Sequence, residues 1–198
     1  MKKIKLTGTS VAQDTNNIAA GVTASSGVAF TLITDATPDA LAHKLIITPT
    51  GSVTGNYGIS GLDADGAAVS ETLATSTTNA VTSAKYYSTG IIVTAPAGLG
   101  LETVSIGYTA DSVSETVHPE LNSSITDGAF NIGFGCTVGT GTPTYTVQHT
   151  YDGVTWFSHA TVAAETTSQE GAYTSPVSAI RLLWAAAGQV TLTGYQIA

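Results

Sequence analysis

Hydrophobic and polar residues alternate along much of the chain with the period of two that a β-strand produces. The clearest run is 130–138, where every second residue from Phe130 to Val138 is apolar and the residues between them are Asn, Gly or Thr. A strand with one apolar and one hydroxyl-rich face suits an antiparallel sheet that packs on one side only. Because no long window carries a 3.6-residue period, the pattern predicts an all-β chain with under about a tenth of its residues in helices.

Further strands are expected on both sides of this run. The second half of the chain predicts them at 144–151 and 180–184, with another beginning at Val190. The first half predicts six more, at 28–33, 43–49, 57–62, 68–74, 86–94 and 102–109. A single helical turn is compatible with 37–42.

Turn-forming residues separate these strands. Asp65-Gly66 and Asp152-Gly153 each lie between two alternating runs, which predicts hairpins with type I′ turns. The segment from Thr140 to Pro143 is a third expected connection. Many short strands with regularly spaced turns are typical of a sandwich or a barrel.

The chain is expected to form two small antiparallel β-sandwich domains of jelly-roll-like type. The interruption around His118 and Pro119 predicts an N-terminal β-domain at 1–117 and a C-terminal β-sandwich domain at 118–198. Shared-face alternation places six residues of the second domain in one core: Phe130, Ile132, Phe134, Val147, Trp184 and Leu192. A domain of about 80 residues buries little surface, so it is expected to pack on the first domain, on a copy of itself or on a partner.

Composition narrows the possible functions. Charged residues make up only 10% of the chain and the net charge is −8, so a nucleic-acid partner is not expected. The place of charged residues is taken by 34 Thr and 18 Ser, which favour exposed sheet surfaces. No apolar run is long enough to span a membrane, and no apolar segment follows the lysines at the start, so neither a membrane segment nor a secretory signal is expected.

No motif for catalysis or metal binding is present. Asp63 and Asp65 resemble part of a calcium loop, but the positions that would complete it are Gly61 and Thr72, so a hairpin turn is the better interpretation. The only cysteine, Cys136, alternates with apolar residues and is expected to be buried rather than reactive. The four histidines have no metal-ligand spacing: His43, His118, His149 and His159. The chain is therefore predicted not to be an enzyme and to need no cofactor or metal.

The aromatic residues are also compatible with a sugar-binding surface. Trp156-Phe157 follows a predicted turn, and Tyr86-Tyr87 lies in a predicted strand. Adjacent strand residues point to opposite faces, so at most one ring of each pair is expected to be exposed. Trp184 is expected to lie in the core.

The segment from Phe130 to Ile197 resembles a small β-domain of virion structural proteins of tailed bacteriophages. Four stretches carry the resemblance: Phe134-Gly135-Cys136-Thr137-Val138, Tyr145-Thr146-Val147-Gln148-His149-Thr150, Trp156-Phe157-Ser158-His159 and Pro176-Val177-Ser178-Ala179-Ile180-Arg181-Leu182. The first half is similar in style to phage modules with a Gly-x-Asp-x-Asp-Gly hairpin, here Gly61 to Gly66. The resemblance implies a structural role, as a capsid decoration (cement) protein or head-fibre base that stabilises the head.

The expected partners follow from that resemblance. They are the major capsid protein and further copies of this chain, most simply in a trimer, on the capsid surface of a virion made in the bacterial cytoplasm. Lys2, Lys3 and Lys5 form a short basic start, which is expected to be an unanchored arm that contacts the capsid. The alternatives are a neck or tail component and a receptor- or glycan-binding β-module of a phage particle.

Overall fold

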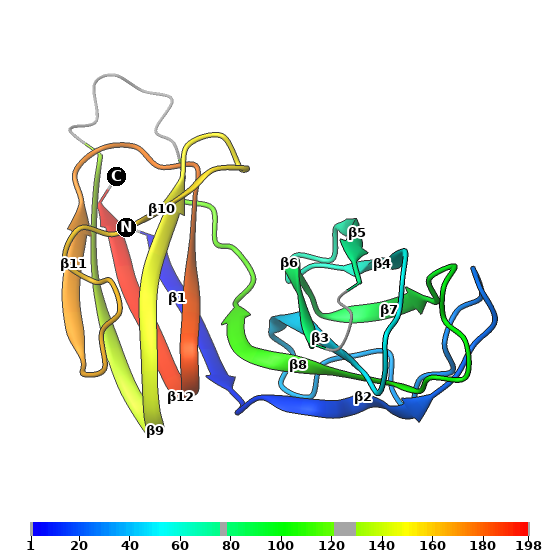
Figure 1. Cartoon of the computed structure of the whole chain (residues 1–198). Coiled ribbons are helices and arrows are strands. Elements are labelled where there is room, and N and C mark those ends of the chain that lie inside the picture. The colour runs from blue at the N-terminus through cyan, green and yellow to red at the C-terminus, as the bar shows by residue number, and fades with distance from the viewer. Residues whose placement is uncertain (1, 76–78, 121–129, 198) are drawn as a thin grey trace. The chain divides into compact units, whose positions relative to one another are not determined.

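The computed structural model describes residues 2–75, 79–120 and 130–197, and every regular element in those ranges is a β-strand (Figure 1). The predicted all-β fold is therefore confirmed. The chain divides into two compact units, one of residues 1–11 and 113–198 and the other of residues 12–112. We call them unit 1 and unit 2.

The division differs from the one expected at residue 117. Residues 1–11 belong to the C-terminal unit, because β1 (Lys2–Ser10) pairs antiparallel with the last strand of the chain along its whole length. Unit 2 is thus inserted between the first strand of unit 1 and the remainder of that unit. The break at His118 and Pro119 lies inside unit 1 and is not a boundary.

Unit 2 is a β-sandwich of seven strands. They are β2 (Asp14–Val22), β3 (Ala42–Pro49), β4 (Asn56–Leu62), β5 (Ala68–Ala74), β6 (Val81–Tyr87), β7 (Thr89–Thr94) and β8 (Val104–Val113), whose last residue already belongs to unit 1. One sheet has the order β2–β8–β3–β6 and the other the order β5–β4–β7. Alternate residues of both sheets meet in a single core, with Leu45 and Ile106 from the first sheet and Tyr57, Ile59 and Val93 from the second.

Unit 1 contains the remaining strands. Besides β1, they are β9 (Asn131–Thr150), β10 (Trp156–Ser158), β11 (Gln169–Tyr173) and β12 (Ala179–Ile197). β12 pairs with β9 along nearly its full length, β1 lies on the other side of β12, and both β10 and β11 pair with β9. Five of the six predicted core residues are buried, and Phe130 is half-buried at the start of β9.

The two long strands of unit 1 bend in the middle and return, as Figure 1 shows. The pairing of β9 with β12 is irregular between Trp184 and Val190, and Gly141 and Gly188 face each other there with φ values of +83° and +149°. Folding one two-stranded ribbon on itself in this way produces two layers. The bend also explains the sequence pattern, because the buried apolar residues of β9 are even-numbered before Gly141 and odd-numbered after it.

The bend replaces the connection that was predicted at Thr140–Pro143. Strand pairing continues through this segment, so the two strands expected at 130–138 and 144–151 form one strand, β9. The strand expected at 86–94 is two strands separated by Ser88, and 28–33 contributes only an isolated bridge at Ala29. β1 and β2 were not predicted, and 37–42 forms a turn rather than a helical turn.

Both predicted Asp-Gly hairpins are present, but not as type I′ turns. A type I′ turn needs positive φ at both central residues. Here only the glycines have it, Gly66 at +75° and Gly153 at +77°. Asp63 stabilises the first turn because its carboxylate accepts hydrogen bonds from the backbone N–H groups of Asp65 and Ala67.

Candidate interaction surfaces

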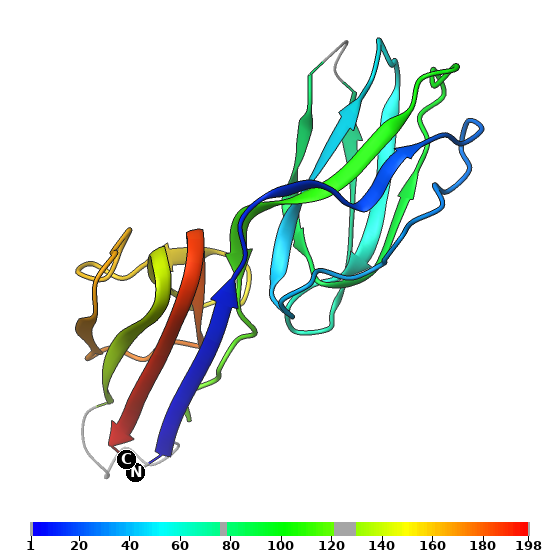
Figure 2. The ribbon, with the colours of Figure 1, turned by 90° about the horizontal axis from the view of Figure 1, so that it is seen from below.

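The lysines at the start of the chain lie on a strand and not on a free arm. Ile4 and Leu6 are buried and alternate with the exposed Lys3 and Lys5, so β1 is a structural part of unit 1 (Figure 2). Lys2 is half-buried, and its ammonium lies 3.3 Å from a carboxylate oxygen of Glu120. Lys3 and Lys5 are therefore the two lysines of β1 that are exposed and form no ion pair within the described residues.

His43 forms a buried pair with Asp39 in unit 2. Its Nε2 lies 2.8 Å from a carboxylate oxygen of Asp39, and its Nδ1 lies 2.8 Å from the carbonyl oxygen of Thr109. Both ring nitrogens are therefore within hydrogen-bond distance of an oxygen. The side chains are 0% and 6% exposed, so the pair has no access to a substrate and serves the fold.

The other histidines also have structural surroundings. A ring nitrogen of His118 is hydrogen-bonded to the carbonyl oxygen of Ser178, and a ring nitrogen of His159 to that of Ala172. The half-buried His149 packs on aromatic rings, and burial lowers its pKa, with a smaller effect from the charge of His159. Within the described ranges no three His, Cys, Asp or Glu side chains are grouped so that they could hold a metal ion.

Cys136 is a small buried residue, as predicted. It is 2% exposed, and burial raises the pKa of its thiol to about 12. A thiol with such a pKa is almost wholly protonated at neutral pH and is a poor nucleophile. The side chain contributes packing rather than chemistry.

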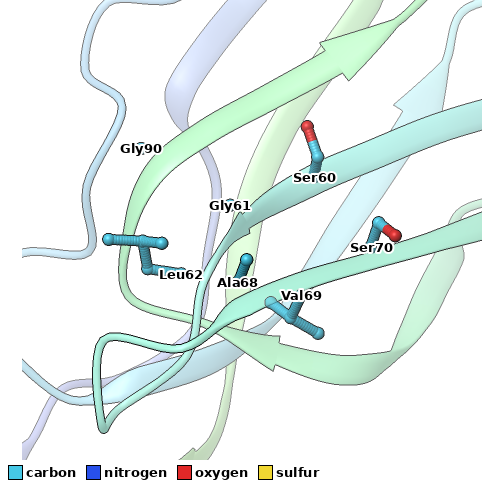
Figure 3. A pocket seen from close by; sticks show the side chains of 7 residues that line it. All are labelled: Ser60, Gly61, Leu62, Ala68, Val69, Ser70 and Gly90. Carbon is cyan, nitrogen blue, oxygen red and sulfur yellow. The ribbon is translucent and has the colours of Figure 1, made fainter.

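Two shallow depressions lie on unit 2. One, of about 480 Å³, is on the sheet of β4, β5 and β7 and is lined by Ser60, Leu62, Val69 and Ser70 among others (Figure 3). The other, of about 650 Å³, lies between the loops 23–26 and 99–101. Neither is lined by an ionisable side chain, so neither supplies a general acid or base.

The β9–β10 hairpin of unit 1 has a tightly held turn. The carboxylate of Asp152 accepts hydrogen bonds from the N–H groups of Val154 and Thr155, at 2.8 and 2.7 Å. It also accepts from the hydroxyl groups of Thr150 and Thr155, both at 3.0 Å. These bonds, led by that from the Thr155 N–H, hold the pKa of Asp152 well below its usual range. The turn therefore presents its neighbouring side chains in a fixed geometry.

Three exposed apolar side chains surround this turn, and we call them the hairpin patch: Tyr151, Val154 and Phe157. They are 58%, 81% and 46% exposed, and the rings of Tyr151 and Phe157 are 5.9 Å apart. Both rings also contact His149, at 5.4 and 5.8 Å. Exposed apolar side chains gathered on a rigid turn are typical of a binding surface.

The sequence anticipated only part of this patch. It predicted that at most one ring of Trp156-Phe157 is exposed, and Phe157 is exposed while Trp156 is half-buried beneath the guanidinium group of Arg181, 4.0 Å from its ring centre. Tyr87 and Trp184 are fully buried, in agreement with the prediction. The strand expected at 144–151 includes Tyr151, but β9 ends at Thr150 and leaves that ring in solvent.

No family model matches the chain, and no curated protein matches it. No helix in the described part of the chain is long and apolar enough to cross a membrane.

Proposed function

We propose that this protein is a non-enzymatic structural protein of a tailed-phage particle, which binds the outer capsid surface as a decoration protein and stabilises the head. The observation that carries the proposal is the hairpin patch. Aromatic and apolar side chains on a rigid element are the usual anchors of protein–protein contacts, because little conformational entropy is lost when they bind. The major capsid protein is the proposed partner, and the virion surface is the proposed location.

The surfaces and charges of the chain support this role over catalysis. Hydroxyl-rich sheets and a net charge of −8 suit a module that lies on a shell and away from packaged DNA. His43 and Cys136 are buried, so neither side chain is accessible to a substrate. The resemblance of 130–197 to virion β-domains points in the same direction.

The basic start of the chain was predicted to contact the capsid as an arm. Because β1 is a strand of unit 1, that contact is now proposed only for the exposed side chains of Lys3 and Lys5. Deleting residues 1–6 would remove the buried Ile4 and Leu6, so it is not a suitable test. Substitutions of the two lysines by glutamine keep the strand and remove only the charges.

Binding to undecorated capsids tests the proposal. The wild-type chain is expected to co-sediment with capsids and to raise the temperature at which heads release DNA. The double variant Tyr151→Ser with Phe157→Ser is expected to lose at least about tenfold in affinity, since anchor residues contribute about 1–2 kcal/mol or more each. Ile33→Ser is the matched control, because Ile33 is 71% exposed but lies in unit 2.

Two outcomes would count against a capsid role for the patch. Equal co-sedimentation of the wild type and the double variant would remove the hairpin patch from the contact. Absence of any co-sedimentation would reject decoration altogether and leave a neck or tail location.

Glycan binding is the second candidate, and the exposed rings of Tyr151 and Phe157 favour it. The apolar face of a sugar stacks on exposed aromatic rings, and a net negative protein suits a neutral glycan. Screening the full chain on immobilised neutral glycans tests this candidate. Binding that disappears in the double variant, without capsid binding, would establish the glycan function in place of decoration.

A further inference from the structure

One sheet of unit 1 presents a broad face to solvent. Its strands, in order of pairing, are β1, the C-terminal half of β12, the N-terminal half of β9 and β11. Figure 2 shows β1, β12 and β9 side by side in this order. Leu6, Leu192 and Cys136 are aligned across the sheet and are buried, so the residues next to them in sequence point to the opposite, outer face.

The outer face consists of rows of aligned residues. Two adjacent rows are Lys5–Thr193–Gly135–Glu170 and Lys3–Tyr195–Gly133–Ala172. In each row the β12 residue, Thr193 or Tyr195, has a side chain, whereas its neighbour on β9 is a glycine. A Cβ built on Gly133 or on Gly135 would meet nothing within 4 Å, so the space above both glycines is open.

Opposite charges lie at the two edges of this face. Lys5 is exposed on β1, Glu170 is exposed on β11, and neither forms an ion pair within the described residues. Three strand spacings of about 4.8 Å separate them, which is about 14 Å and too far for an ion pair within one copy. A second copy is able to supply the missing partner for each.

The rows become complementary to themselves under a twofold rotation. We take the axis parallel to the strands, midway between β12 and β9. The rotation exchanges β1 with β11 and β12 with β9 while it keeps each row level with itself. Lys5 of one copy then faces Glu170 of the other, and Thr193 and Tyr195 face Gly135 and Gly133. Each β12 side chain thus meets a position without a side chain, and Lys5 meets its opposite charge, whereas Lys3 faces the small Ala172.

We infer that this face binds a second copy of the chain in a face-to-face, twofold pair, with Lys5 of each copy paired to Glu170 of the other. The inference goes beyond the proposed decoration role and does not depend on it. It replaces the trimer expected from the resemblance, because a face that is complementary to itself closes after two copies.

The size of the face sets the expected strength of the pair. β1, β12 and β9 over four rows, and β11 over two, cover about 450 Å² on each copy, from strand spacings of about 4.8 Å and row spacings of about 6.8 Å. A stable interface buries about 800 Å² on each partner. The pair is therefore expected to be weak and to form as the protein concentration rises.

Sedimentation of the full chain at low salt tests the inference. The wild type is expected to approach twice its chain mass of 20.0 kDa with rising concentration. Lys5→Glu and Glu170→Lys are each expected to raise the dissociation constant at least about tenfold, because each places like charges opposite one another. The double variant restores opposite charges and is expected to return to within about threefold of the wild type.

A size variant and a charge control complete the design. Gly135→Leu fits the free chain, since its Cβ meets no atom, but it closes the space for Thr193 of the other copy and is expected to give a monomer. Lys85→Glu makes the same change in net charge on the exposed surface of unit 2 and is expected to pair normally. A wild type that stays monomeric or forms trimers would overturn the inference, as would single charge reversals that pair like the wild type. Capsid binding is measured separately, so its loss or retention does not decide this result.

Discussion

The bend of β9 and β12 gives the most direct test of the fold of unit 1. Gly188 has a φ of +149°, a conformation that residues with a side chain rarely adopt. A Cβ on this residue would lie 2.5 Å from Cδ and 2.7 Å from the nitrogen of Pro143 on the facing strand. Gly188→Ala therefore introduces both backbone strain and steric overlap at the one point where the ribbon folds on itself.

The expected loss of stability follows from these two effects. Backbone strain at a disfavoured φ costs about 1–3 kcal/mol. Overlap with a rigid proline ring costs about 1–3 kcal/mol more. The reduced entropy of the unfolded chain offsets about 0.4–1 kcal/mol of this. We expect the free energy of unfolding of unit 1 to fall by about 2–5 kcal/mol, a large part of the 5–15 kcal/mol that is usual for a domain.

Tryptophan fluorescence during urea unfolding measures this loss selectively. Both tryptophans of the chain, Trp156 and Trp184, belong to unit 1, and Trp184 is fully buried. The signal therefore reports unit 1 and is insensitive to unit 2. The matched control is Gly135→Ala, which also lies on β9 but has room for a Cβ, and it is expected to change stability by less than about 1 kcal/mol.

Equal urea midpoints for Gly188→Ala and Gly135→Ala would refute the reasoning. That result would mean that the ribbon does not fold at Gly188, or that Pro143 moves away at no cost. Gly141 faces Gly188 and has a φ of +83°. A loss of stability in Gly141→Ala as well as in Gly188→Ala would therefore support the bend.

Four further predictions concern the core, a buried pair, pH and metals. Phe134→Ala removes a ring that is 5% exposed and should cost about 3–5 kcal/mol in urea unfolding; a change within error would show that the ring does not pack in the core. Asp39→Ala leaves the buried His43 Nε2 without its hydrogen-bond partner and should destabilise unit 2 by about 1–3 kcal/mol, measured by hydrogen exchange of β3 amides against those of unit 1. Because the pKa of His149 is lowered in the folded state, its contribution to the stability of unit 1 is present above the ordinary value of 6.5 and is lost as pH falls through the folded value. The urea midpoint should therefore fall as the pH is lowered below about 6.5, and it should fall less steeply in His149→Gln. EDTA should leave the melting temperature unchanged, whereas a drop of several degrees would reopen the metal-loop interpretation of the β4–β5 turn.

The sequence alone determined the fold class and much of the interior. A period of two identifies strands because side chains alternate between the faces of a sheet, and this is a local property. It correctly placed Ile132, Phe134 and Trp184 inside, and it identified Cys136 as a buried residue without reactive chemistry. The Asp-Gly pairs likewise marked both hairpins, because positive φ at glycine is also a local requirement.

Long-range pairing was decided by the tertiary structure. The basic start with Lys2, Lys3 and Lys5 looked like a free arm, and only pairing with β12, at the far end of the chain, makes it part of a strand. The same pairing carries the first residues into the C-terminal unit, which no boundary signal in the sequence marks. Gly141 looked like a turn residue of the connection expected at Thr140–Pro143, and its role in the bend with Gly188 depends on two strands being aligned.

The candidate surfaces belong to the tertiary structure for the same reason. Lys5 and Glu170 are 165 positions apart, and Gly135 and Thr193 are 58 apart, yet register brings all four into one row. Local alternation fixes the face on which each residue lies, but it carries no information about which residue of another strand lies beside it. The exposure of Tyr151 similarly depends on where pairing stops, and that is set by the whole sheet rather than by the residues around the turn.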